Sequence, residues 1–265
     1  MVRIAVLGAT GRMGRLVIDA VVRADDLKLV AALTRAGSQA IGTDAGVLAG
    51  AGAVGVPIAS ASADALADCD VIIDFSSPDA LGQILPLSGD IPLVSGTTGL
   101  GPDLLDALVE RAHRGPVLVA ANFSTGVTLL RDLVERAARA LPDYDVEIVE
   151  AHHRFKRDAP SGTALALGQS AAAGRDWNHD EVAVHGREGQ VGPRPEREIG
   201  YHAIRGGGII GEHEVWLVGP GERIQLSHSA IHRATFADGA VRAARWIHGR
   251  APGRYDLRDV LGLGR

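Results

Sequence analysis

The sequence predicts an α/β protein with two parts, an N-terminal doubly wound parallel sheet and a second α+β domain with a mixed sheet. The first part is predicted by short strands that are apolar throughout and by the helical patterns between them. Such strands are typical of parallel sheets that helices cover on both faces. The second part is predicted because candidate strands later in the chain follow one another without helices.

The first part alternates between strand and helix patterns. We expect its strands at residues 2–7, 27–33, 71–75, 92–96 and 116–122. Amphipathic segments between several of them predict helices, notably at 15–24 and 103–114. This alternation is what a doubly wound sheet requires.

The regular alternation of predicted strands and helices ends after residue 123. Residues 124–141 predict one long helix that ends before Pro142, and 145–153 alternate as a strand. Residues 161–174 predict a helix with a C-terminal glycine. Residues 175–198 are polar, charged and proline-bearing, which predicts a mobile or partner-covered loop.

Further strands and a last helix complete the second half. The candidate strands lie at 201–205, 208–218 and 222–231. The helix predicted at 236–249 is expected to pack back on the first domain. We therefore expect one domain from 1–123 together with 233–265, and a second domain from 124–232.

Composition narrows the classes of function. The chain has 265 residues, 46% hydrophobic and 22% charged, which is ordinary for a globular protein. A net charge of −5 argues against a nucleic-acid partner held by bulk electrostatics. The single cysteine, Cys69, excludes an intrachain disulfide and a multi-cysteine metal site. No apolar run approaches about 18 residues and no leader pattern is seen, so we expect a cytoplasmic protein without a membrane partner.

A glycine-rich turn, GATGRMG, lies between the first strand and the first helix. Gly8, Gly11 and Gly14 have a G-x-x-G-x-x-G spacing rather than G-x-G-x-x-G. Small residues let the backbone approach a pyrophosphate, and the helix start supplies N–H groups. Arg12 would add positive charge. The turn predicts a dinucleotide site, with a plain glycine-rich turn as the alternative.

The end of the second strand bears on the choice of dinucleotide. NAD-binding domains have an acidic residue there for the ribose hydroxyls, but this chain has Thr34 followed by Arg35. A guanidinium can pair with a 2′-phosphate, so we expect NADPH to be accepted, with the balance of preference towards it rather than NADH. The alternative is that Arg35 only faces solvent.

Two later loops also follow apolar strands. Gly96, Thr97 and Thr98 suit contacts to ribose or nicotinamide, and Asn122 suits a bond to a carboxamide. In a doubly wound sheet, ligands lie at the carboxyl ends of strands. Turns after strands also use these residue types routinely, which is the alternative reading.

The stretch EAHHRFKRDAPSGT contains several groups that could transfer a proton or bind an anion. Neighbouring side chains on a strand face opposite ways, so His152 and His153 suit separate roles better than one metal ion. A histidine can exchange a proton, and Lys156 can stabilise a carboxylate or a developing nitrogen anion. Gly162 and Thr163 offer N–H groups at a helix start. These residues predict a small anionic substrate with a reducible C=N or C=O bond; a polar surface loop is the alternative.

The segment EAHHRFKRDAPSGTA also resembles the signature of the 4-hydroxy-tetrahydrodipicolinate reductase (dihydrodipicolinate reductase) family of the diaminopimelate–lysine pathway. Matching segments occur in the expected order along the chain: GATGRMG, VIIDFSSPDA, GTTG, AANFSTGV, GREG, GEHEV, HRATFADGAVRAARW and YDLRDVLGL. The resemblance implies a Rossmann-like N-terminal domain that the C-terminal segment completes, a domain for substrate binding and oligomerisation, and a homotetramer. It implies reduction of 4-hydroxy-tetrahydrodipicolinate to tetrahydrodipicolinate, with loss of water, by NADPH or NADH.

The resemblance further implies roles for individual residues. His152 and Lys156 would be catalytic, while the dicarboxylate substrate would be bound by His153, Gly162, Thr163 and Arg233. The dinucleotide would contact Gly8, Ala9, Thr10, Gly11, Arg12, Met13, Gly96, Thr97, Thr98, Ala120, Ala121, Asn122 and Phe123, with Thr34 and Arg35 beside its ribose. The family commonly has an acidic residue where this chain has Thr34, and this departure bears on selectivity for NADH.

Two other functions were weighed against this one. A dehydrogenase for an amino-acid semialdehyde would use a nucleophilic cysteine, but Cys69 precedes a buried-looking strand. A catalytically silent dinucleotide sensor would keep GATGRMG without needing His152 and Lys156 together. Retention of both residues favours an enzyme.

Overall fold

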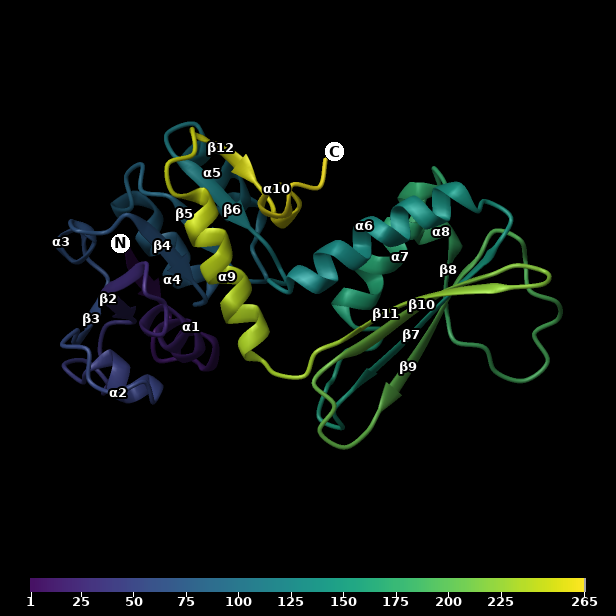
Figure 1. The fold of residues 1–265 in the computed structure, drawn as a ribbon, viewed down its shortest axis with the longest axis horizontal. Helices are drawn as coiled ribbons and strands as arrows, with labels where there is room; N and C mark the ends of the chain where they lie inside the picture. The colour runs from purple at the N-terminus through teal and green to yellow at the C-terminus, as the bar shows by residue number, and fades with distance from the viewer. Residues whose placement is uncertain (265) are drawn as a thin grey trace. The chain divides into compact units, whose positions relative to one another are not determined.

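The computed structural model describes residues 1–264 and divides into two compact units (Figure 1). Unit 1 contains Met1–Ser124 together with the segment from Ala234 onward, and unit 2 contains Thr125–Arg233. Within residues 1–264, no helix has both the length and the apolar character needed to cross a membrane.

Unit 1 is built on a seven-stranded sheet with the order β12-β6-β5-β4-β1-β2-β3. The strands are β1 (Val2–Leu7), β2 (Leu27–Thr34), β3 (Ile58–Ser60), β4 (Val71–Asp74), β5 (Leu93–Ser95), β6 (Pro116–Val119) and β12 (Gly253–Tyr255). Every pair in the sheet is parallel. The strand order changes direction at β1, so the carboxyl ends of β1, β2 and β4 frame the crevice where ligands bind in such sheets. The predicted doubly wound sheet is confirmed.

Helices cover both faces of this sheet. Ile4 and Val6 of β1 pack into one core with α1 (Arg12–Val22) and α9 (Ala234–Ile247), while Leu7 packs into the opposite core. The first face also carries α2 (Ala45–Ala49) and α10 (Leu257–Leu261). The opposite face carries α3 (Ala63–Leu66), α4 (Pro78–Ile84), η1 (Leu85–Leu87) and α5 (Pro102–Ala112). Alternate residues of one strand are buried in two cores, which is why the strands are apolar throughout.

Unit 2 contains a five-stranded sheet with the order β11-β10-β7-β9-β8. Its strands are β7 (Asp145–His152), β8 (Ala183–His185), β9 (Ile199–Arg205), β10 (Glu212–Val218) and β11 (Arg223–Ser229). β7 pairs antiparallel with β10 and parallel with β9, so the predicted mixed sheet is confirmed. The helices α6 (Thr125–Ala140) and α7 (Gly162–Gly174) pack on one face, where Val146 and Ile148 are buried.

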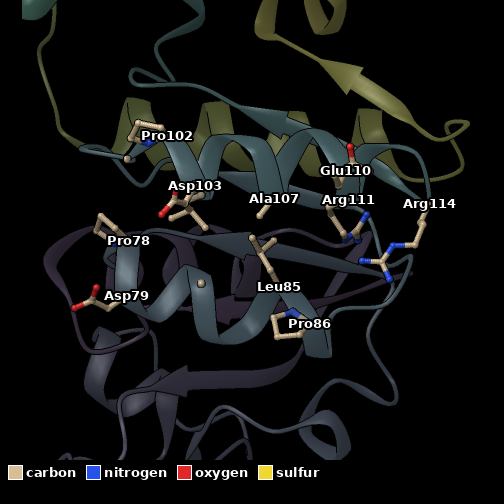
Figure 2. Close-up of a pocket in the computed structure, with 13 residues that line it drawn as sticks. Pro78, Asp79, Leu85, Pro86, Pro102, Asp103, Ala107, Glu110, Arg111 and Arg114 are labelled. Atoms are coloured by element: carbon tan, nitrogen blue, oxygen red, sulfur yellow. The ribbon is translucent and has the colours of Figure 1, made fainter.

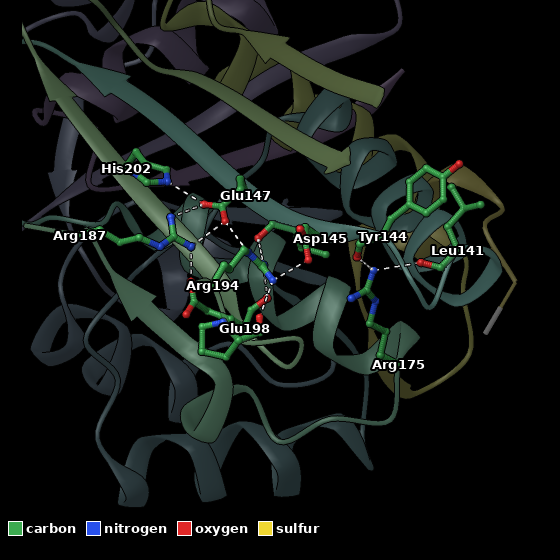
Figure 3. Close-up of polar contacts among 11 residues, drawn as sticks. Leu141, Tyr144, Asp145, Glu147, Arg175, Arg187, Arg194, Glu198 and His202 are labelled. Atoms are coloured by element: carbon green, nitrogen blue, oxygen red, sulfur yellow. Dashed lines mark hydrogen bonds and ion pairs between the residues drawn. The ribbon is translucent and has the colours of Figure 1, made fainter. Parts of the chain in front are cut away.

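The polar segment 175–198, which was expected to be a mobile or partner-covered loop, contains secondary structure. It contains α8 (His179–Val182) and the edge strand β8. Figure 3 shows how Arg187 and Arg194 reach back to Glu147 of β7. Arg187 also pairs with Glu198, so a network of ion pairs anchors the segment to the sheet. Elements this short carry too little hydrophobic periodicity to be read from sequence.

Candidate active site

The glycine turn of unit 1 is shaped by close backbone contacts. Gly8 has φ +81°, and a Cβ there would lie 2.4 Å from the Phe75 carbonyl oxygen. A Cβ on Gly14 would lie 2.1 Å from the Gly8 carbonyl oxygen. Only glycine therefore fits at these two positions. The turn delivers the chain directly into α1, which begins at Arg12 without a side-chain cap, so its first N–H groups are suited to an anion.

A pocket of about 220 Å³ opens beside this turn, at the carboxyl ends of β1, β2 and β4. Its lining residues include Gly8, Thr10, Gly11, Thr34, Arg35, Ser76 and Ser77. Thr34 is buried, and its Oγ1 lies 3.0 Å from Thr10 Oγ1. Arg35 is exposed at the same edge and also lines a neighbouring pocket of about 60 Å³. The glycine cradle and this basic edge fit a phosphorylated dinucleotide.

A buried carboxylate fastens the next loop to the sheet. Asp74 at the end of β4 has no exposed surface and accepts hydrogen bonds from Ser95 Oγ at 2.6 Å and Thr97 Oγ1 at 2.7 Å. It also accepts a bond of 2.5 Å from Ser76 Oγ. Burial raises the pKa of Asp74, although these hydroxyl bonds oppose that rise. Asp74 is not among the residues predicted from the sequence to form the site, although it lies in the apolar run that predicted β4.

The other residues proposed to contact the cofactor differ in how exposed their side chains are. Gly96 has no room for a side chain, because a Cβ would lie 2.3 Å from the Phe75 ring, whereas Thr98 is exposed. Asn122 Oδ1 accepts a bond from the Ser124 N–H at 2.8 Å. The Phe123 side chain is only 1% exposed and packs in the core of unit 1.

The remaining predicted residues of the glycine turn and of the loop after β6 also differ in exposure. Ala9 is fully buried and Met13 is half-buried against the core. Ala120 is half-buried, whereas Ala121 is exposed. Where a side chain of these loops is buried in the core, only the backbone of that residue could contact a ligand.

Unit 2 holds the second cluster, at the end of β7. Glu150 is 1% exposed and accepts a bond from His152 Nδ1 at 2.7 Å. Arg205 of β9 donates two bonds to the same carboxylate, at 2.7 and 2.8 Å. Burial alone would raise the pKa of Glu150, but the bonds from Arg205 and His152 outweigh it and hold that pKa below its ordinary value. Burial lowers the pKa of His152, and Glu150 only partly offsets this.

The loop after β7 carries the lysine of the motif. Lys156 Nζ lies 2.7 and 2.8 Å from the two carboxylate oxygens of Asp158, and its side chain is 18% exposed. Arg205 also donates to the Asp158 carbonyl at 2.8 Å. Arg205 therefore holds both this loop and Glu150. The cations Arg205 and Lys156 both act on the charge of His152.

The start of α7 closes this cluster. Ser161 is the N-cap residue, and its Oγ accepts a bond from the Ala164 N–H at 3.1 Å. The Ser161 N–H donates to Glu150 at 3.0 Å, and its Oγ lies 3.0 Å from His213 Nε2. The first turn that contains Gly162 is therefore joined to the ends of β7 and β10.

Two further predicted substrate ligands lie apart from these contacts. His153 Nδ1 is buried without a hydrogen-bond partner among residues 1–264, and the ring lies 6.4 Å from that of Phe155. Arg233 is exposed just before α9. No cluster of His, Cys, Asp or Glu suited to a metal ion occurs in the described part of the chain. Arg205 and His213 are not among the residues predicted from the sequence to form the site, although His213 lies in the matching segment GEHEV.

A roomier pocket of about 640 Å³ lies between α4 and α5 of unit 1 (Figure 2). Its walls combine apolar residues such as Leu85 with the carboxylates of Asp79 and Glu110 and the guanidinium of Arg114. It is formed by the outer helices and does not include the glycine turn. The glycine turn lines only the smaller pocket at the strand ends.

Comparison with known proteins identifies the family. The family model for the dihydrodipicolinate reductase N-terminus matches residues 2–123, and the model for the C-terminus matches 126–261. The 4-hydroxy-tetrahydrodipicolinate reductase of Alkalilimnicola ehrlichii is 54% identical, over 98% of this chain and 99% of that one. The reductase of that name in Acinetobacter baumannii is 51% identical, over 98% and 96%.

A solved structure supports the same assignment. The dipicolinate-bound dihydrodipicolinate reductase from Paenisporosarcina sp. TG-14 has a TM-score of 0.75 and 25% identity, and the match covers 97% of each chain. The two family models together span both units. The chain therefore belongs to the dihydrodipicolinate reductase family.

Proposed function

We propose that this protein reduces 4-hydroxy-tetrahydrodipicolinate to tetrahydrodipicolinate, with loss of water, at the expense of NADPH or NADH in diaminopimelate and lysine biosynthesis. The observation that carries the proposal is the similarity, over nearly the whole chain, to relatives named for this reaction. The glycine cradle and the cluster around His152 and Glu150 provide the chemistry that such a reaction needs.

The dinucleotide is proposed to bind at the carboxyl ends of the strands of unit 1. Gly8 to Met13 would hold its pyrophosphate. The glycines in this range have no side chain to keep a ligand from the backbone, and no side chain caps the first N–H groups of α1. Gly96 to Thr98 and Ala120 to Phe123 would line the remainder of the site, with Phe123 contributing only its backbone. The bound dinucleotide would supply the hydride.

Use of NADPH at least as well as NADH is proposed from the basic edge at the end of β2. Thr34 is buried and its hydroxyl pairs with Thr10, so no carboxylate is present to repel a 2′-phosphate. Arg35 is exposed and lines the pocket.

Parallel Michaelis constants test the assignment at the end of β2. Arg35→Ala should raise KM for NADPH roughly tenfold and leave KM for NADH nearly unchanged, since a hydrogen bond to a charged group contributes about 1.5–3 kcal/mol. Thr34→Glu should shift the preference towards NADH. An unchanged ratio in both variants would remove residues 34 and 35 from cofactor selection.

The substrate is a small dicarboxylate, and unit 2 offers groups for its two charges. Gly162 and Thr163 lie in the first turn of α7, where the positive end of the helix dipole favours an anion. His153, whose buried Nδ1 has no hydrogen-bond partner within residues 1–264, and the exposed Arg233 are proposed to bind the substrate's carboxylates. Lys156 would stabilise negative charge that develops during reduction.

A proton must also be delivered, and His152 and Lys156 are proposed for this step. His152 is half-buried beside Glu150, and Lys156 Nζ is held by Asp158 until a substrate competes for it. Loss of either residue should reduce turnover by roughly 10²–10⁴-fold, the usual range for acid–base catalysis.

The direct test is oxidation of NADPH or NADH at 340 nm, with the substrate generated in situ by the preceding synthase. Lys156→Ala should lose most turnover while NADPH binding, followed by fluorescence, survives. Loss of NADPH binding would instead place Lys156 in the cofactor site. A wild-type protein that binds dinucleotide tightly without turnover would indicate a sensor.

A homotetramer is proposed from the open face of the sheet in unit 2. Trp216 alternates with the buried Val215 and Leu217, so it faces away from α6 and α7. Ile204 is 52% exposed. Sedimentation of the wild type as a four-chain species, and as a smaller one for Trp216→Glu, would support this assembly; a wild-type monomer would refute it.

A cytoplasmic location is proposed because reduced nicotinamide dinucleotides are supplied inside the cell. The proposal is tested by fractionation of cells that express the chain with a C-terminal epitope tag. Recovery in the membrane or the secreted fraction would contradict it.

A further inference from the structure

We propose that Glu150 is a positioning residue that fixes the tautomer of His152, and that Nε2 is the nitrogen that exchanges the proton, because Gly211 leaves it uncovered while His213 packs against the ring. The inference rests on the proposed function and deepens it by assigning the reacting atom. It also gives a role to the GEHEV segment, which the reaction as described above does not use.

The tautomer follows from the partners of Glu150. Its carboxylate receives two bonds from Arg205 and one from the Ser161 N–H. These donors keep it ionised, and an ionised carboxylate can only accept hydrogen bonds. The nitrogen 2.7 Å away, His152 Nδ1, must therefore carry a hydrogen. In the neutral imidazole the lone pair then lies on Nε2.

Gly211 leaves that second nitrogen uncovered. A Cβ built on Gly211 would lie 3.1 Å from His152 Nε2 and 3.5 Å from Cδ2. This distance is tighter than nearly all real Cβ contacts, so a methyl group there would cover Nε2 or turn the ring. The backbone of Gly211 is outside the left-handed region, so the missing side chain leaves open space in front of the imidazole rather than relieving backbone strain.

His213 packs edge-to-face against the imidazole ring of His152. The two imidazoles lie 5.2 Å apart with an interplanar angle of 74°, an edge-to-face contact. Burial, followed by the charge of His152, lowers the pKa of His213 to about 4, so this neighbour stays neutral at pH 7. Its Nε2 also lies 3.0 Å from Ser161 Oγ, which links the imidazole pair to the N-cap of α7.

The charges around His152 set the direction of its response to pH. The groups that face it from neighbouring elements are Glu150, Lys156, Arg205 and His213. Of these, only Glu150 favours the protonated imidazole, whereas the two cations disfavour it. Because a protonated His152 is proposed to deliver the proton, removing the Glu150 charge should lower the pKa of His152 and shift the basic limb of the rate profile to lower pH.

The experiment compares Glu150→Gln with a matched control on the same strand. Glu147 is likewise bound by arginines and by a histidine, His202 (Figure 3), but it is half-buried rather than buried. Because it is three positions from Glu150 along β7, it lies on the opposite face of that strand. We measure kcat and both KM values from pH 5 to 9 for Glu150→Gln, Gly211→Ala and Glu147→Gln. Imidazole ¹⁵N NMR of the wild type and of each variant reports the tautomer.

The wild type should show hydrogen on Nδ1 of His152 and a lone pair on Nε2. Glu150→Gln should lose this pattern, lower kcat by roughly 10–100-fold, the usual effect of losing an orienting partner, and leave KM for the dinucleotide unchanged. Gly211→Ala should lower kcat while keeping hydrogen on Nδ1. Glu147→Gln should keep the wild-type pH profile.

Two results would overturn the proposal. One is hydrogen on Nε2 of His152 in the wild type, which NMR detects even if Glu150→Gln does not fold and even if no turnover is seen. The other is a Glu150→Gln variant with the kcat, pH profile and tautomer of the wild type. Absence of wild-type turnover with the expected tautomer intact would count against the proposed function alone.

Discussion

Replacing Gly14 by alanine would put a methyl group where the backbone of the neighbouring turn already lies. The new Cβ would sit 2.1 Å from the Gly8 carbonyl oxygen, 2.7 Å from its carbon and 2.9 Å from Ala9 Cα. All three atoms belong to the backbone, so no side-chain rotation relieves the contact. Ordinary contact begins at 3.4 Å, so α1 and the turn must separate by about 1.3 Å.

Two effects of different size follow from this separation. Overpacking of a buried contact costs about 1–3 kcal/mol of unfolding free energy. The turn that is proposed to hold the pyrophosphate would also be displaced, and a displacement of about 1 Å can cost on the order of 10²-fold in a positioned site. We therefore expect a folded variant with an NADPH dissociation constant raised by about 10²-fold.

The assay is a fluorescence titration with NADPH, together with urea unfolding. Gly82→Ala is the matched control, because Gly82 is an exposed helical glycine whose nearest foreign atom is Leu104 Cδ1, at 3.9 Å from a built Cβ. That control should bind NADPH normally and gain about 0.5–1 kcal/mol from helix propensity. Wild-type affinity in Gly14→Ala would refute the assignment of the turn as a tightly packed cofactor cradle.

Three further predictions concern stability and reactivity. Asp74→Ala should lower the unfolding free energy in urea by about 1–3 kcal/mol, because the buried hydroxyls of Ser95 and Thr97 lose this acceptor, as does the half-buried hydroxyl of Ser76. The bonds from Arg187 and other cations to Glu147 outweigh its burial and hold its pKa at about 2, below the ordinary 4.5, so stability should be constant above about pH 5 and fall as pH drops from 4.5 towards 2. Cys69 is 8% exposed and burial raises its pKa to about 12, so a disulfide reagent should modify it only after unfolding.

Each of these predictions has a control. Asp106→Ala, at an exposed position of α5, should change the unfolding free energy by no more than about 0.5 kcal/mol. An equal loss in both variants would show that the buried bonds of Asp74 add no stability. Glu147→Gln should flatten the acid dependence, and an unchanged slope would assign it to other carboxylates. Rapid labelling of Cys69 in the native protein would show that its surroundings open readily.

The main strands of unit 1 could be predicted because burial on both faces leaves an apolar run that is visible in the sequence. The strands β3, β8 and β12 could not be predicted, because their three residues show no clear period and they form only by pairing with a neighbouring strand. The helix α1 starts at Arg12 rather than near residue 15, since the glycine turn leads straight into it. Local patterns thus predicted the long elements, and pairing across the sheet decided the short ones.

The two halves of the candidate site differ in the same way. The spacing in residues 150–163 predicted separate roles for His152 and Lys156 and an N-terminal turn at Gly162, and these remain predictions of function. Nothing local indicated that Arg205 would bind Glu150 or that His213 would pack on His152. Those contacts require β9 and β10 to flank β7 in the sheet.

By itself, the sequence determined the fold class, the glycine turn and the segment that carries the reactive groups, because these depend on residues close together in the chain. Tertiary structure alone decided that Thr97 turns its hydroxyl to Asp74, and that Glu150 is the buried partner of His152. A buried carboxylate must find its donors wherever the fold brings them. For Glu150 those donors include Arg205, which is 55 positions away in the chain.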